Sequence, residues 1–187
     1  MKSLVVAILI TALVCAALSS QRARPYARPD EFETVPQIVR DQLEQRHCLI
    51  PQDPQTKELH NIVQGEFAHK GQTDWAAYCS VEGQSQVVVI WGGPSRCVGE
   101  PFGSERPIPD GELERTWDAD QWGKMPPGGS YWKLSAVPRA AVATAKGIPL
   151  TPLRTPAKHD TLKGTFPGGM NLVYCKSGKW QDLSYAD

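Results

Sequence analysis

The chain has 187 residues, 41% of them hydrophobic, and its 20 basic and 20 acidic side chains give a formal net charge of zero. It contains neither a basic stripe nor a basic run, which argues against nucleic-acid binding. The length is that of one domain of ordinary size, which can bury a core of its own.

Residues 1–20 have the layout of a secretory signal peptide. Lys2 precedes an apolar run over residues 4–17, and small residues follow that run. The run is shorter than the roughly 20 residues that a spanning helix needs. We therefore predict cleavage after Ser19 or Ser20, a secreted or periplasmic protein, and no membrane span in the mature chain.

Two segments follow the leader. Residues 21–33 are rich in proline and charge, which predicts a flexible arm. Residues 34–46 have helical periodicity, with Thr34 available as a cap. The apolar side chains expected on one face are Val35, Ile38, Val39 and Leu43.

The next segments predict antiparallel strands. Residues 61–91 contain three strand-like runs separated by turn residues, and the run at residues 87–90 is apolar on both faces, as in a covered central strand. A strand at 131–137, a short helix at 138–147 and a hairpin at 170–185 follow. We expect an α+β, mainly antiparallel β fold. Residues 34–187 would form one domain with a single sheet of five or six strands and two short helices.

The segment between Cys97 and Ser130 has no hydrophobic period and predicts a long loop. Trp117 and Trp122 lie there among charged residues. Flat aromatic rings beside carboxylates can hold a sugar or a peptide, although they can also pin a loop to a sheet. We therefore consider both tryptophans candidate ligand-binding residues. The loop also holds five carboxylates that a hydrolase could use: Asp110, Glu112, Glu114, Asp118 and Asp120.

Four cysteines remain after the leader is removed, and an even number in an exported chain predicts two disulfides. Their spacing is not that of a zinc site. From the expected positions of the strands we favour Cys48–Cys79 with Cys97–Cys175. The rival pairing joins Cys79 to Cys97 and Cys48 to Cys175.

The stretch GEFAHKGQTDWA, residues 65–76, resembles a single FG-GAP repeat, the calcium-loop hairpin of integrin-type propellers. It keeps Gly65, Phe67, Gly71 and Asp74 of that pattern. Two positions at which the family supplies oxygen ligands are occupied by Ala68 and Lys70. Because calcium requires six to eight oxygens, we expect a structural hairpin without a metal.

A broader resemblance covers most of the mature chain. The order CLIPQ, VQGEF, GQTDWAAYCS and VVVIWGG, with HD and GKW near the end, is similar to secreted bacterial proteins of unassigned function. This resemblance implies export and a small disulfide-bonded domain. It supplies no catalytic residues, and we expect no cofactor.

His159 and Asp160 are the best catalytic candidates, but neighbouring side chains on a strand diverge and do not form a dyad by themselves. No Gly-x-Ser-x-Gly turn and no phosphate-binding loop is present. The favoured interpretation is a non-enzymatic binding module for an unknown protein or carbohydrate. The alternative is a secreted hydrolase that uses His159 and Asp160 or the carboxylates of the long loop.

Overall fold

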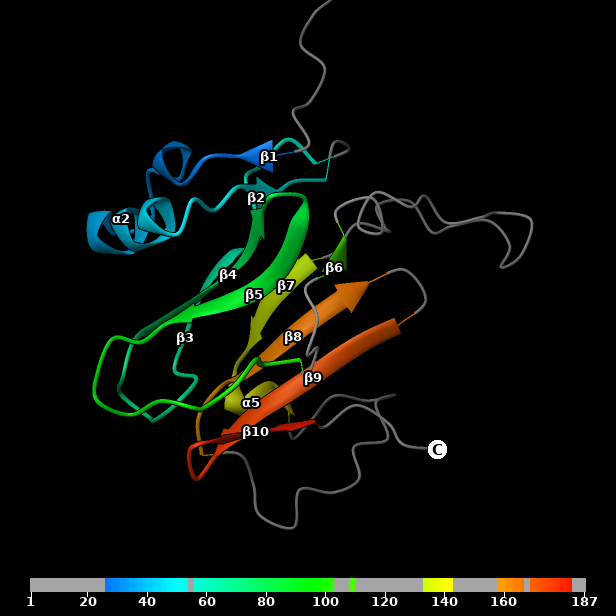
Figure 1. Cartoon of the computed structure of the whole chain (residues 1–187). Coiled ribbons are helices and arrows are strands. Elements are labelled where there is room, and N and C mark those ends of the chain that lie inside the picture. Colours follow the sequence, from blue (N-terminus) through cyan, green and yellow to red (C-terminus); the bar gives the residue numbers. More distant parts are fainter. Residues whose placement is uncertain are drawn as a thin grey trace, which may run out of the picture.

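The computed structural model describes residues 26–53, 56–102, 108–109, 133–142, 158–166 and 169–182 (Figure 1). The predicted leader, Trp117, Trp122 and the five carboxylates of the long loop lie outside these residues. In chain order the elements are β1 Tyr26–Ala27, η1 Pro29–Glu31, α2 Gln37–Gln45, β2 Ile50–Pro51, β3 Ile62–Gly65, β4 Asp74–Val81, β5 Gln84–Ile90, β6 Ile108–Pro109, β7 Lys133–Val137, α5 Arg139–Val142, β8 Thr161–Phe166, β9 Gly169–Lys176 and β10 Lys179–Asp182.

The predicted antiparallel character is confirmed, but the prediction of one sheet is wrong. The strands form two four-stranded sheets, with orders β3-β4-β5-β6 and β10-β9-β8-β7, and a two-stranded sheet of β1 and β2. All the pairings between these strands are antiparallel. The physical reason lies in β4 and β5, which carry apolar side chains on both faces. Both faces must be covered, so the C-terminal strands pack across the first sheet rather than extending it.

The β3–β6 sheet is the middle layer of the molecule. On one face Val88 and Ile90 pack with Val39 and Leu43 of α2. On the other face Val87 packs in a second cluster with Leu134, Leu162 and Val173 of the β7–β10 sheet. Figure 1 shows the same order, with α2 and the β1–β2 pair on one side and the β7–β10 sheet on the other. Strand β5 is therefore covered on both sides, as its sequence predicts.

Helix α2 is confirmed, but it differs from the prediction in two details. Its N-cap is Pro36 and no side chain caps it, so Thr34 does not have the predicted role. Val35, Val39 and Leu43 are buried, whereas Ile38 is 68% exposed. At about 100° per residue, Ile38 lies roughly 100° around the axis from Val39, outside the stripe of residues spaced four apart.

Leu43→Ala is expected to reduce the free energy of unfolding by about 3 kcal/mol, because Leu43 is fully buried and a cavity would remain. Ile38→Ala on the same helix is the matched control and should change it by less than about 0.5 kcal/mol. Urea unfolding of both variants measures the difference. Equal losses would contradict the assignment of the buried face.

The N-terminal arm differs from its prediction over residues 26–33. Ala27 and Phe32 are buried in the core beneath α2, and β1 pairs with β2. Apolar side chains spaced along a charged segment are enough to dock it.

The sequence did not predict strand β8, which pairs with both β7 and β9, since Gly164 interrupts its apolar pattern.

Two disulfides join the layers. Cys48 bonds to Cys79 with a Cα–Cα distance of 4.8 Å, and Cys97 bonds to Cys175 with a Cα–Cα distance of 5.8 Å. These are the pairs favoured from the sequence. The first bond connects the chain after α2 to β4, and the second connects the chain after β5 to β9. Over the residues that the structure describes, no helix is long and apolar enough to cross a membrane.

Candidate functional site

Asp74 is the centre of the hairpin formed by β3 and β4. Its carboxylate is fully buried. It accepts four hydrogen bonds of 2.7–3.0 Å, from the backbone N–H groups of Phe67, Ala68 and Gly92 and from the side-chain amide of Gln72. The loop thus directs four N–H donors at this carboxylate.

This network gives Asp74 a structural role. A carboxylate that ligates calcium must present free lone pairs, whereas those of Asp74 point at hydrogen-bond donors. Gln72 extends the network, since its amide also donates to the carbonyl oxygen of Ser95 and accepts from the N–H of Ser95. Asp74 and Gln72 therefore hold residues 92–95, the start of the segment that follows β5.

Calcium is expected to leave the melting temperature of the protein unchanged, because the carboxylate of Asp74 is already occupied by N–H donors and Lys70 adds a like charge to the loop. Differential scanning calorimetry with and without millimolar calcium, at constant ionic strength, tests this. A rise in melting temperature that Lys70→Ala enlarges would contradict it.

The side chains of His159 and Asp160 make separate contacts with different parts of the fold. The two oxygens of the Asp160 carboxylate accept the backbone N–H groups of Glu66 and Arg139, at 3.0 and 3.2 Å. The ring of His159 is buried and stacks on Tyr174, with 4.4 Å between ring centroids. His159 is therefore a buried side chain of the core. Asp160 instead joins the end of β3 to the start of α5.

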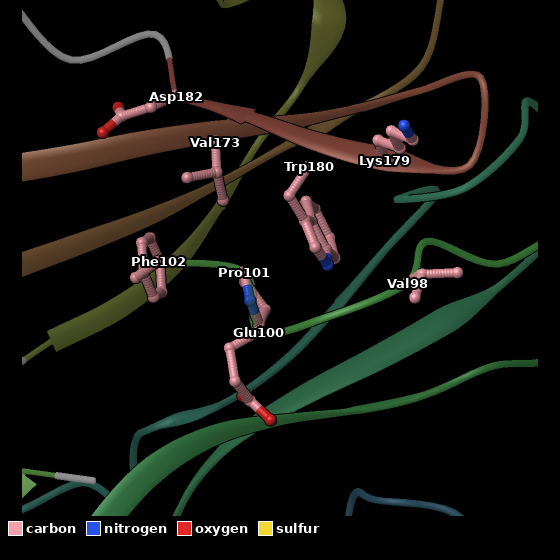
Figure 2. A pocket seen from close by; sticks show the side chains of 8 residues that line it. All are labelled: Val98, Glu100, Pro101, Phe102, Val173, Lys179, Trp180 and Asp182. Atoms are coloured by element: carbon pink, nitrogen blue, oxygen red, sulfur yellow. The ribbon is translucent and has the colours of Figure 1, made fainter. Parts of the chain in front are cut away.

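An open hollow of about 380 Å³ lies between the β9–β10 hairpin and the segment that follows β5. We call it the aromatic hollow (Figure 2). It is lined by Val98, Glu100, Pro101, Phe102, Val173, Lys179, Trp180 and Asp182.

Three interactions hold this hollow in shape. The Cys97–Cys175 bond fixes residue 97 to β9, and the N–H of Val98 donates to the carbonyl oxygen of Gly178 at 2.9 Å. The indole N–H of Trp180 donates to the carbonyl oxygen of Gly99 at 3.2 Å. We call residues 91–102 the connecting segment. Its second half is thereby fixed along the C-terminal hairpin.

Apolar side chains form the base of the aromatic hollow and charged side chains surround it. Figure 2 shows Trp180 pointing from β10 toward the connecting segment, with Glu100 and Asp182 on opposite sides. Trp180 also stacks on Trp91, at a centroid distance of 6.0 Å. Partial burial raises the pKa of Glu100, and the guanidinium of Arg46 counteracts that shift.

The arrangement is suited to holding a ligand by contact with flat apolar surface and by hydrogen bonds at its edge. Within the described segments no group of three or more His, Cys, Asp or Glu side chains is placed to hold a metal. No sequence pattern singled out Trp180, Val98 or Phe102 as a ligand-binding residue. The signal that could have placed Trp180 beside the connecting segment was the pairing of Cys97 with Cys175, because Trp180 lies opposite Cys175 in the hairpin register.

Comparison with known proteins finds no matching family model, no matching curated sequence and no matching solved structure.

Proposed function

We propose that this chain is an exported, non-enzymatic module that binds a carbohydrate in the aromatic hollow. The sequence of the leader supports export, and two disulfides are compatible with an oxidising compartment outside the cytoplasm.

Mass spectrometry of the protein from its host should find a mature N-terminus near Ser20 or Gln21, because we expect the leader to be cleaved there. An intact Met1 in the soluble cytoplasmic fraction would contradict export.

The observation that carries this proposal is the side chain of Trp180 over an apolar base, with Glu100, Lys179 and Asp182 around it. A sugar ring presents an apolar C–H face and an edge of hydroxyl groups. An indole ring covers such a face, while carboxylates accept hydrogen bonds from hydroxyls and an ammonium donates to them. The volume of the hollow, about 380 Å³, lies in the range of small-molecule sites.

The hydrolase alternative receives less support from the described residues. The carboxylate of Asp160 is engaged by two backbone N–H groups and His159 is stacked on Tyr174. A general acid or base must instead reach the atom whose proton it transfers. The carboxylates of the long loop lie outside the described residues, so activity must be measured directly.

A glycan array probed with labelled protein tests the proposal. We expect a defined subset of glycans to bind wild-type protein and to lose binding to Val98→Ser, which changes an apolar side chain at the hollow that is 77% exposed. Ile38→Ser is the matched control, because Ile38 is 68% exposed on α2 and does not line the hollow. If no glycan binds, or if Val98→Ser binds like wild type, the carbohydrate proposal is wrong.

The same glycans distinguish binding from hydrolysis. Each bound oligosaccharide is incubated with the protein and its length is followed by chromatography. Under the proposal the oligosaccharides stay intact. Shorter products formed by wild-type protein would establish the hydrolase instead.

A further inference from the structure

A second hollow, which we call the arginine hollow, lies beside the aromatic hollow. Its volume is about 440 Å³, and it is bounded by the C-terminal half of α2, the end of β5 and the first part of the connecting segment. Arg46 enters it from the chain after α2 and Arg96 from the connecting segment, together with the amide of Gln42 and the ring of Trp91. None of the described residues that line it is acidic.

Both guanidinium groups are available to a ligand. Arg46 and Arg96 are exposed, and neither forms an ion pair with a carboxylate in the described part of the chain, where the Arg28–Asp30 pair is the one observed. A guanidinium binds the oxygens of a carboxylate or a sulfate through two parallel hydrogen bonds. Two such groups from separate elements in one concave site therefore favour an oxyanion.

The two hollows share a wall. Trp91 of the arginine hollow stacks on Trp180 of the aromatic hollow. Arg46 of the first is close enough to Glu100 of the second to influence the charge of its carboxyl group. A single extended ligand can therefore contact both hollows at once.

We propose that the arginine hollow binds the acidic group of a glycan whose neighbouring neutral sugar lies on Trp180. The placement of the acidic group in one hollow and of the neutral sugar in the other follows from the charged side chains that line each hollow. At the aromatic hollow Glu100 and Asp182 outnumber the single cation Lys179 and disfavour an acidic sugar, whereas the adjacent hollow has Arg46 and Arg96 and no acid, and attracts a carboxylate or sulfate ester. The glycan part of this inference rests on the proposed function, whereas the anion site can be measured without it.

Inorganic sulfate, added at constant ionic strength, is the first probe. We expect saturable shifts of the arginine Nε–H resonances of Arg46 and Arg96 in nitrogen–proton NMR spectra. Affinity should be about millimolar, because exposed charges are well screened. Sulfate should also shift the side-chain N–H resonances of Gln42 and Trp91, which line the same hollow, and Arg46→Ala with Arg96→Ala should abolish those shifts. The charge-matched control, Arg28→Ala with Arg139→Ala, should bind sulfate like wild type.

Glu100→Gln is expected to raise the affinity for sulfate, whereas the arginine substitutions lower it. Glu100 lies in the field of Arg46 and competes with an added anion, so its neutralisation should strengthen sulfate binding by about two- to fivefold. A merely structural role of Arg46 predicts no such gain. Absence of saturable sulfate shifts, or unchanged shifts in the double arginine variant, would overturn the anion site.

A sulfated hexasaccharide of the chondroitin type and its chemically desulfated form are the second probe. We expect the sulfated form to bind more tightly, and the preference to disappear in the double arginine variant. If sulfate binds but neither hexasaccharide does, the anion site stands and the glycan assignment fails. Equal or tighter binding of an oligoglutamate peptide or of phosphatidylglycerol vesicles would also overturn the glycan assignment.

Discussion

Asp74→Ala is expected to reduce the free energy of unfolding by at least about 3 kcal/mol. The substitution leaves three buried or half-buried backbone N–H groups and one amide without their acceptor, and each such loss costs about 1–3 kcal/mol. Asp74→Asn should be milder, because one oxygen remains, but its new N–H₂ group would face two donors. Guanidinium chloride unfolding measures both variants.

Asp41→Ala provides the control for Asp74→Ala. Asp41 lies on the exposed side of α2, where it accepts a hydrogen bond from the side chain of Gln37. Its removal should change the free energy of unfolding by less than about 0.5 kcal/mol. If Asp74→Ala were equally mild, the carboxylate would not be the structural centre of the hairpin.

Replacing Cys97 and Cys175 by serine is expected to reduce the free energy of unfolding by about 4.5 kcal/mol and to abolish ligand binding. The bond closes a chain segment of 78 residues, and loop-closure entropy gives the energy. The loss of ligand binding follows from the position of the Cys97–Cys175 bond at the aromatic hollow. Without the bond, residues 98–102 lose their covalent attachment to the hairpin that carries Trp180. Unfolding curves and the glycan array measure the two effects.

The other disulfide supplies a matched comparison. Replacing Cys48 and Cys79 by serine opens a segment of 31 residues, for which the same relation gives about 3.7 kcal/mol. This variant should be destabilised yet keep a neutral glycan in the aromatic hollow at temperatures where it is folded, because Cys48–Cys79 lies on the α2 side of the sheet. A greater loss of binding here than in the Cys97 and Cys175 variant would contradict the role assigned to each bond.

Much of the architecture could be predicted from hydrophobic periodicity and turn residues within short stretches of the sequence. The helix at residues 37–45 and strands β3, β4 and β5 of the first sheet have clear hydrophobic periods. The hairpin of β9 and β10 has Ser177 and Gly178 at its turn. The covered strand β5 could be identified because its valines alternate between two apolar faces. The favoured disulfide pairs followed from the expected positions of these elements, although the sequence also left the rival pairing of Cys79 with Cys97 open.

The candidate site could not be predicted in the same way. Trp117 and Trp122 were singled out because of their charged neighbours, but they lie outside the described residues. Trp180 alternates with polar residues in a short strand, which indicates a side chain facing a core. Its position beside Val98 and Phe102 depends on a contact across about 80 positions of the chain, which no local pattern encodes.

The sequence by itself determined most of the local elements, the number of disulfides and the lack of side-chain oxygens at Ala68 and Lys70, because these depend on residue type and on spacing along the chain. Tertiary structure alone decided that the strands divide into two packed sheets, that Ile38 faces outward, and that the carboxylates of Asp74 and Asp160 accept backbone N–H groups. It also brought the connecting segment onto the C-terminal hairpin. The physical reason is that burial and hydrogen bonding are satisfied between segments distant in sequence. The free energy of such contacts belongs to the folded arrangement and not to any one stretch of chain.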